Sequence, residues 1–206
     1  MSCWSCQSAL TAGVDTCPRC GKLQPLRTGD YFAYLGLPRS YHVDPERLSE
    51  ILRERSRTLH PDRYARASDR EKALSLQHTT LLNDAVRTLR DPQKRAEYLL
   101  SLYGLKAGAT ERTGAKMEPG FLMEMMETRE ALADALKAKD AAKLEKIKAS
   151  ATTERQSLLS AAEARFSEWE KQPEDKKPLE AVVPLLDKAR YFDQIVAEAS
   201  GSPHHG

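Results

Sequence analysis

The run PERLSEILRERSRTLHPD, residues 45–62, is a helical pattern that ends on a polar tripeptide. Its apolar residues recur at helical spacing and make most of one stripe, formed by Leu48, Ile51, Leu52 and Leu59. Asp44 supplies an N-cap, and the proline that follows suits the first turn of a helix. We therefore predict a helix over Pro45–Leu59 and a loop at His60-Pro61-Asp62.

A second helical pattern follows this loop, over Asp69–Arg90. Its apolar stripe is expected to contain Ala73, Leu74, Leu76, Leu81, Ala85 and Leu89. Asp91-Pro92 ends this helix and starts another, whose apolar face consists of Ala96, Leu99, Leu100 and Tyr103. No strand pattern is visible beyond the first 27 residues, so the predicted fold class is all-α.

Three motifs surround the two helices in a characteristic order. They are DYFAYLGLP at residues 30–38, HPDR at 60–63 and LNDAVRTLRDP at 82–92. In order and spacing they resemble a J-domain, the module that stimulates ATP hydrolysis by a DnaK-type chaperone, over residues 28–104. An isolated His-Pro-Asp is usually an ordinary loop, but the flanking helices and the two outer motifs favour the J-domain.

The J-domain resemblance implies that the His60-Pro61-Asp62 loop docks on the chaperone ATPase, together with the basic face of the preceding helix. Arg53 and Arg57 lie one turn apart and off the apolar stripe, so both can face an acidic partner. Glu50 and Glu54 on the same helix leave open the alternative of a solvated charged face.

Arg55 departs from the J-domain pattern, because J-domains usually carry a leucine that faces the core at this position. Its stem can run along the edge of the core while its charge stays in water. Alternatively, the helix packs against the core through Ile51 instead of through this position. The departure concerns the packing and leaves the resemblance intact.

Residues 1–27 contain every cysteine of the chain, in two Cys-x-x-Cys pairs. The four are Cys3, Cys6, Cys17 and Cys20. Two such turns can complete a tetrahedral sulfur site, and this segment has too little apolar surface to fold without the bond energy of a metal. We predict one structural zinc ion; iron is less favoured, and so are disulfides and thiol redox catalysis. Lys22 and Arg27 are too few for a nucleic-acid-binding patch.

Residues 119–199 contain long helical patterns that break near Lys139-Asp140 and over 172–178, which predicts three helices. A linker is expected over residues 105–118, where Gly108 and Gly114 lie, and a tail over residues 200–206.

The first of these helices carries two kinds of face. Its core residues are expected to be Phe121, Met125, Leu132 and Leu136. A second face combines apolar groups with acids, and its members are Leu122, Met123, Met126, Glu127, Glu130 and Asp134. Methionines give an adaptable contact surface, although the same stripe could instead face the core of the bundle.

Motifs in the second half of the chain narrow the resemblance. They are KRAEYLL at residues 94–100, FLMEMME at 121–127 and YFD at 191–193. They are similar to the HscB family, the dedicated J-proteins of iron–sulfur cluster biogenesis, and the likeness covers residues 30–199. The four cysteines match the longer form of that family, which begins with such a module.

The HscB resemblance implies an L-shaped molecule with a J-domain and a carboxyl-terminal three-helix bundle. The J-domain would stimulate an HscA-like chaperone, and the bundle would hold the scaffold protein IscU. IscU would contact the face made of methionines and acids, with Tyr191 contributing from the last helix. This chain has Met126 where the family commonly has leucine, and Asp134 where it often has glutamate.

The composition of the whole chain excludes several classes of protein. The 206 residues are 40% hydrophobic and 30% charged, and the net charge is +2, which gives no sign of nucleic-acid binding. No apolar run approaches the roughly 20 residues of a membrane-spanning helix. There is no phosphate-cradling glycine-rich loop, catalytic triad or carboxylate dyad, so we expect a protein that is not an enzyme.

Met1 leads directly into the first cysteine pair, which leaves no room for a signal or transit peptide. A cytoplasmic bacterial protein is therefore expected, and a mature mitochondrial form is left open. Two rival functions remain, a general J-domain co-chaperone with other clients and a Cys-x-x-Cys thiol oxidoreductase. The oligomeric state is also open, and a homodimer is one of its alternatives.

Overall fold

The computed structural model describes residues 1–11, 14–26, 29–107 and 118–201. Its helices are α1 (Tyr31–Leu35), α2 (Pro45–Leu59), the 3₁₀ turn η1 (Pro61–Tyr64), α3 (Asp69–Arg90), α4 (Pro92–Leu102), α6 (Pro119–Ala138), α7 (Ala141–Lys171) and α8 (Lys177–Ala199). The predicted all-α class is confirmed. Most of the predicted linker and tail lies outside the described residues.

The chain divides into two compact units, Met1–Arg95 and Ala96–Gly206, and the division falls within α4. None of the helices in the described residues combines the length and the apolar character that crossing a bilayer requires.

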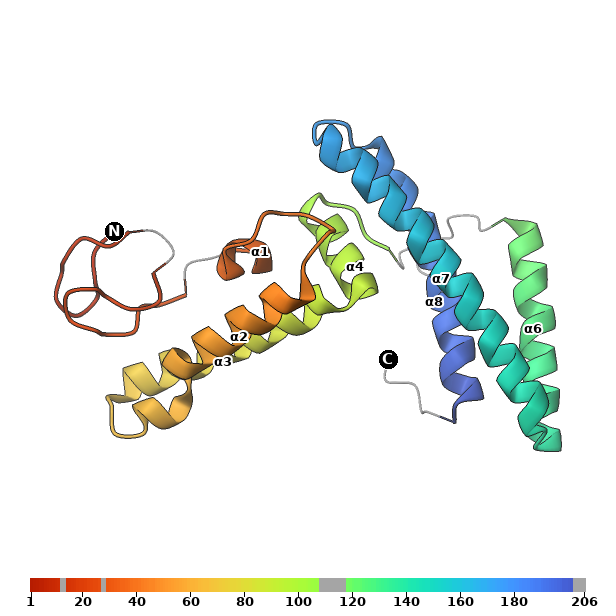
Figure 1. The fold of residues 1–206 in the computed structure, drawn as a ribbon, viewed down its shortest axis with the longest axis horizontal. Helices are drawn as coiled ribbons and strands as arrows, with labels where there is room; N and C mark the ends of the chain where they lie inside the picture. Colours follow the sequence, from red (N-terminus) through yellow and green to blue (C-terminus); the bar gives the residue numbers. More distant parts are fainter. Residues whose placement is uncertain (12–13, 27–28, 108–117, 202–206) are drawn as a thin grey trace. The chain divides into compact units, whose positions relative to one another are not determined.

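In the first unit, α2 and α3 lie side by side and are joined by η1 (Figure 1). Both helices have the bounds that the sequence predicts. The side chain of Asp44 accepts a hydrogen bond from the backbone of Glu46, and Ser68 caps α3 in the same way. Leucines from both helices form the core with Phe32 of α1, and the fully buried ones include Leu48, Leu59, Leu82 and Leu89.

The buried face of α3 differs from the predicted stripe. Leu76 is 61% exposed, and Ala73 is also exposed. The buried positions include three polar residues instead, Glu71, Ser75 and His78. Each of these has a hydrogen-bonding partner from another segment, so a pattern of apolar residues alone could not place them.

The cysteine module (residues 1–27) consists of turns rather than helices over residues 1–11 and 14–26. Among its described residues, two isolated antiparallel bridges pair Ser2 with Ala9 and Thr16 with Leu23. Gly21 follows the last cysteine and has a φ of 70°, a conformation that other residues adopt rarely.

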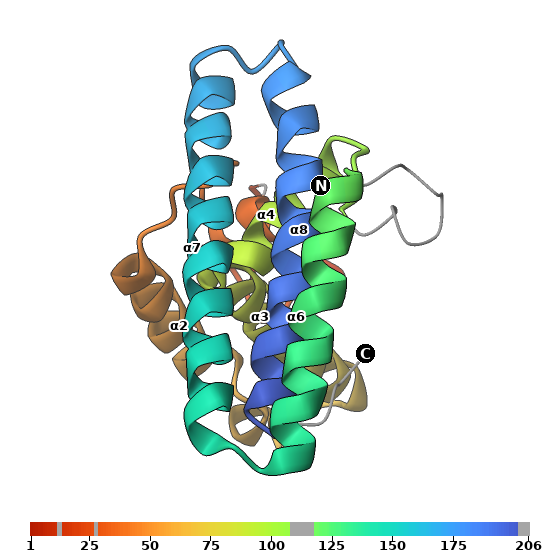
Figure 2. The ribbon, with the colours of Figure 1, turned by 90° about the vertical axis from the view of Figure 1, so that its right-hand side faces the viewer.

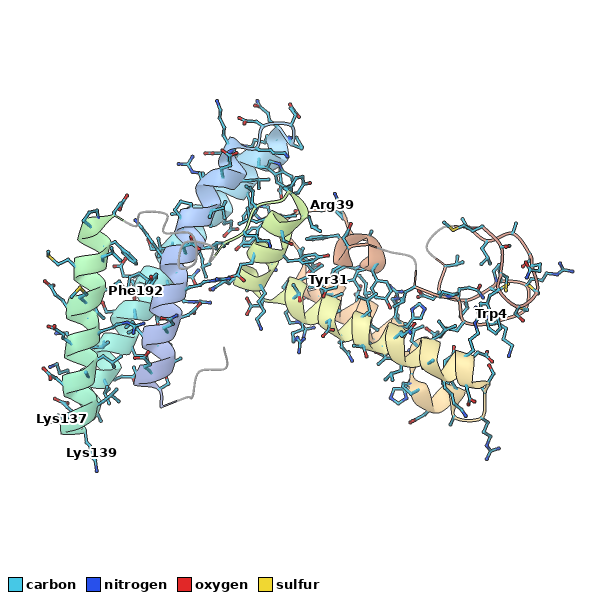
Figure 3. All side chains as sticks on the ribbon, turned by 180° about the vertical axis from the view of Figure 1, so that it is seen from behind. Trp4, Tyr31, Arg39, Lys137, Lys139 and Phe192 are labelled. Atoms are coloured by element: carbon cyan, nitrogen blue, oxygen red, sulfur yellow. The ribbon has the colours of Figure 1, made fainter. Side chains whose placement is uncertain are left out.

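In the second unit, α6, α7 and α8 run alongside one another, with α8 in contact with both of the others (Figure 2). Phe192 of α8 packs against Phe121 of α6, with the ring centroids 6.0 Å apart (Figure 3). Met125 and Leu132 are buried as predicted, but Leu136 is 44% exposed, which corrects its assignment to the core. Ala135 is the buried residue in that turn of the helix. Its neighbour Leu136 lies at the border of the core face.

Candidate functional site

The His-Pro-Asp loop, His60-Pro61-Asp62, lies at the end of α2 and is open to solvent. The side chains of His60 and Asp62 are 55% and 91% exposed. Nδ1 of His60 accepts a hydrogen bond from the backbone N–H of Asp62 at 3.3 Å, and Pro61 begins η1. The loop therefore presents two polar side chains on a backbone that the proline and this hydrogen bond restrict.

Side chains from both sides of the loop bind the last carbonyl groups of α2. The hydroxyl of Tyr64 donates to the carbonyl of Thr58 at 3.1 Å. The carbonyl of Leu59 accepts from Ser75 at 2.6 Å and from Thr79 at 3.2 Å, both on α3. These carbonyls would otherwise lack partners at a helix end, so the bonds fix the position of the loop on the two helices.

The two predicted arginines of α2, Arg53 and Arg57, are both exposed. Glu50, a candidate partner for Arg53, forms an ion pair with Arg47 at 3.1 Å. Arg53 and Arg57 therefore stand on the solvent side of the helix that ends at the His-Pro-Asp loop, where an acidic partner can reach them.

The predicted face of α6 is exposed along its whole length. Its members, Leu122, Met123, Met126, Glu127, Glu130 and Asp134, form what we call the exposed α6 face. Met123 and Met126 are each 66% exposed, and Leu122 is 42% exposed. The alternative that this stripe faces the bundle core is wrong, since Met125 and Leu132 occupy the core side of α6.

Tyr191 lies on α8 and is partly buried. Its ring meets that of Phe121 edge to face, with the centroids 5.8 Å apart. Phe121 packs against the core, so Tyr191 lies at the contact between α6 and α8.

The four cysteines come together as one cluster, and their sulfur atoms all lie within 4.8 Å of one another. The Sγ atoms of Cys3 and Cys20 are 3.7 Å apart, and those of Cys6 and Cys17 are 3.6 Å apart. A tetrahedral ion with metal–sulfur bonds of about 2.3 Å would hold its sulfurs roughly 3.8 Å apart. The cluster therefore fits a single tetrahedral metal ion.

Hydrogen bonds to two of the sulfurs favour the thiolate form, which is the form that binds a metal cation. The backbone N–H groups of Ser5 and Cys6 point at the sulfur of Cys3, and the side-chain amide of Gln24 donates to it at 3.4 Å. The Ser8 hydroxyl, 3.3 Å away, lowers the pKa of Cys17 to about 6, which favours the thiolate.

Cys20 shows the opposite effect. The backbone N–H of Lys22 favours its thiolate, but burial and the three neighbouring sulfurs outweigh this and raise the pKa of Cys20 to about 12. Four thiolates this close repel one another, and a bound cation would remove that repulsion.

The structure also contains a polar contact region that the sequence did not predict, between the cysteine module and α2–α3. Asp15 and Gln24 of the module bind Arg55 of α2 and His78 of α3. The sequence offered one signal, a charged Arg55 at a position expected to face the core.

Comparisons with known proteins agree with this geometry. Residues 117–200 match the family model described as HSCB C-terminal oligomerisation domain. The chain is 34% identical over 197 residues to the iron–sulfur cluster co-chaperone protein HscB of Homo sapiens, covering 94% of this chain and 78% of the human protein. It is 36% identical over 168 residues to the co-chaperone protein HscB homolog of Burkholderia multivorans, covering 82% of this chain and 93% of that protein.

Two solved structures are similar throughout most of the chain. The crystal structure of human HscB superposes with a TM-score of 0.84 at 31% identity and covers 97% of both chains. HscB from Vibrio cholerae superposes with a TM-score of 0.67 at 30% identity and covers 84% of this chain and 96% of the other.

Proposed function

Because this chain belongs to the HscB family of iron–sulfur cluster co-chaperones, we propose that it delivers an IscU-type scaffold protein to an HscA/DnaK-type chaperone and stimulates the ATPase of that chaperone. ATP hydrolysis would then increase the affinity of the chaperone for the scaffold and promote cluster transfer. The chain is a co-chaperone and not an enzyme, so its residues act by binding.

The observation that carries the proposal is the exposed α6 face. Met123 and Met126 are each 66% exposed, whereas Met125 and Leu132 of the same helix pack into the bundle core. Flexible thioether side chains edged by acids suit a partner surface that is apolar at its centre and basic at its rim. We propose that the IscU-type scaffold binds here, with Tyr191 at the edge of the contact.

The His-Pro-Asp loop would bind the chaperone. His60 and Asp62 project from a loop that Tyr64 and Ser75 hold against α2 and α3. Arg53 and Arg57 would add long-range attraction to an acidic ATPase surface, so association should weaken as the salt concentration rises.

Scaffold binding tests the first half of the proposal. Met123→Ala together with Met126→Ala should weaken the binding of IscU about tenfold or more, measured by calorimetry, because two anchor side chains are lost. Leu76→Ala is the matched control, since Leu76 is 61% exposed but lies on α3. Failure of the wild-type chain to bind IscU would refute the proposal.

Chaperone ATPase rates test the second half. The wild-type chain should stimulate the steady-state ATPase, IscU should increase the rate further, and His60→Gln should abolish stimulation while IscU binding stays unchanged. Stimulation that never depends on IscU, by a chain that does not bind IscU, would instead favour a general J-domain co-chaperone with other clients.

We also propose that the four cysteines hold one structural zinc ion, as expected for a closed tetrahedral site of thiolates. When bound, the ion would tie the two Cys-x-x-Cys turns together. Elemental analysis of the purified chain should give about one zinc per chain, and Cys3→Ser should lower this content; iron in place of zinc would contradict the assignment. Thiolates of this kind stay reduced in a cytoplasm, which is the location we propose.

A further inference from the structure

A cluster of buried and partly buried polar side chains joins the cysteine module to the two helices that carry the His-Pro-Asp loop. Arg55 of α2 donates to both carboxylate oxygens of Asp15, at 2.6 and 2.5 Å. It also donates to the carbonyl of Tyr34, and its guanidinium lies 4.0 Å from the centre of the Tyr34 ring. Both of the bonds to Asp15 come from one guanidinium nitrogen, Nη2. The Arg55 side chain is only 18% exposed, so this ion pair is largely screened from water.

His78 of α3 makes the second connection. Its Nε2 lies 2.8 Å from the backbone carbonyl of Gln24, and because a carbonyl only accepts, Nε2 carries the hydrogen. The His78 side chain is 3% exposed and its Nδ1 lies 3.6 Å from the carboxylate of Asp15. Asp15 and Gln24 are themselves joined, since the backbone N–H of Gln24 donates to the carbonyl of Asp15 at 2.8 Å.

Gln24 connects this cluster to the cysteines. Its side chain is buried and donates to the sulfur of Cys3 at 3.4 Å and to the carbonyl of Lys22 at 2.7 Å. One residue therefore contacts a predicted metal ligand through its side chain and α3 through its backbone.

Two further contacts lie beside the cluster. Lys22 forms an ion pair with Glu71 of α3 at 2.7 Å, and Arg70 of α3 lies 4.2 Å from the centre of the Trp4 ring. Trp4 donates through Nε1 to the backbone carbonyl of Leu23, so its ring is fixed within the module. The module thus offers one polar surface to α2 and α3.

We propose that the cysteine module is a metal-dependent clamp on the α2–α3 helix pair. Little apolar surface is buried within the module, so its fold depends on the metal. Loss of the metal would withdraw Asp15 and Gln24 and leave Arg55 and His78 without these partners, which destabilises the helix pair. The linkage is reciprocal. If the bound metal stabilises the contact between the module and α2, then a substitution on α2 that breaks this contact must weaken metal binding.

Hydrogen exchange on the full chain tests the clamp in one direction. Removing Zn²⁺ with a chelator should speed exchange of the α2 and α3 backbone amides about tenfold or more. The amides of α6, α7 and α8 belong to the other unit and serve as the internal control, with unchanged exchange. Equal exchange of α2 and α3 with and without Zn²⁺ would overturn the proposal.

Zinc affinity tests the reverse direction, measured by competition with a chromophoric chelator. Arg55→Leu lies on α2, outside the module, and should weaken Zn²⁺ binding about tenfold. Arg47→Leu is the matched control. Arg47 lies on the same helix and forms an ion pair at 3.1 Å with Glu50 of that helix. This pair does not involve the module, so Zn²⁺ affinity should not change. Unchanged Zn²⁺ affinity in Arg55→Leu would refute the linkage.

Leucine is the residue that other J-domains commonly place at this position, so the Arg55→Leu helix pair should remain folded. In that variant, exchange of α2 and α3 should respond less to Zn²⁺ than in the wild-type chain, since the contacts of His78 and Glu71 with the module remain. If Arg55→Leu fails to fold, Glu71→Gln provides the same test, since Glu71 contacts the module through Lys22. The clamp rests on the proposed zinc site. No chaperone or scaffold enters these measurements, so their outcome is independent of the proposed binding of both partners.

Discussion

The ion pair of Lys22 and Glu71 predicts a stability difference that depends on pH. The hydrogen bond from Lys22 lowers the pKa of Glu71, aided by the Ser68 hydroxyl, which donates at 3.0 Å. Since the pKa of Glu71 is lower in the folded than in the unfolded chain, its contribution is complete above the unfolded pKa of about 4.3 and is lost as the pH falls through the folded pKa.

We therefore expect Glu71→Gln to lower the Tm at pH 7 by roughly 2–4 °C. The difference in Tm should shrink as the pH falls below about 4.3 and through the folded pKa of Glu71. Thermal unfolding of both proteins followed by circular dichroism gives the difference at each pH. A difference in Tm that does not shrink at acid pH would contradict the ionic origin of the contact.

The residues of the cysteine module and those that contact it differ in how far the sequence predicts their contacts. The four cysteines could be placed together because thiolates at Cys-x-x-Cys spacing have one common chemistry. Arg55 stood out only as a departure from a family pattern, because its partner Asp15 is 40 positions away and no local pattern links the two. His78 and Gln24 could not be predicted, since a histidine or a glutamine is compatible with many environments.

At the scale of a helix, α6 shows what amphipathic spacing can determine. The exposed and buried faces were predicted from residues three and four apart, and the structure confirms both faces apart from Leu136. The border of a face depends on how far the neighbouring helices cover it. That coverage is set by α7 and α8, which lie beyond residue 140, so the sequence of α6 alone could not decide Leu136.

The end of α6 predicts a stabilising substitution. Lys139, at the tip of the helix in Figure 3, is its C-cap and has a φ of 52°, in the left-handed region where a side chain is unfavourable. Lys139→Gly should stabilise the chain by about 0.5–1 kcal/mol, measured by urea unfolding. Lys137→Gly, two residues earlier and within the helix, should destabilise it by a similar amount. Destabilisation by Lys139→Gly would show that the C-cap is not strained.

For the whole molecule, the sequence indicated the segments but not which of them pack together. Residues 1–27 read as a module of their own, whereas the structure assigns them to one compact unit with α1, α2 and α3. The reason is physical: the contacts that join them are single polar pairs, Asp15 with Arg55 and Lys22 with Glu71, rather than a periodic apolar stripe. The His-Pro-Asp loop and the exposed α6 face belong to different units of the same chain.

This division predicts that the two binding activities can be separated by mutation but cannot be supplied by two different chains. His60→Gln should bind IscU without stimulating the chaperone, and the double variant Met123→Ala with Met126→Ala should retain basal stimulation without the increase caused by IscU. A mixture of the two variants should not restore that increase.

The reason is the covalent connection between the two units. It gives the bound scaffold a high effective concentration near the chaperone, and two separate chains lack this connection. Chaperone ATPase rates measured with each variant alone and with an equimolar mixture provide the comparison. Restored dependence on IscU in the mixture would mean that one chain can present the scaffold for another, as in a homodimer, and would contradict delivery by a single chain.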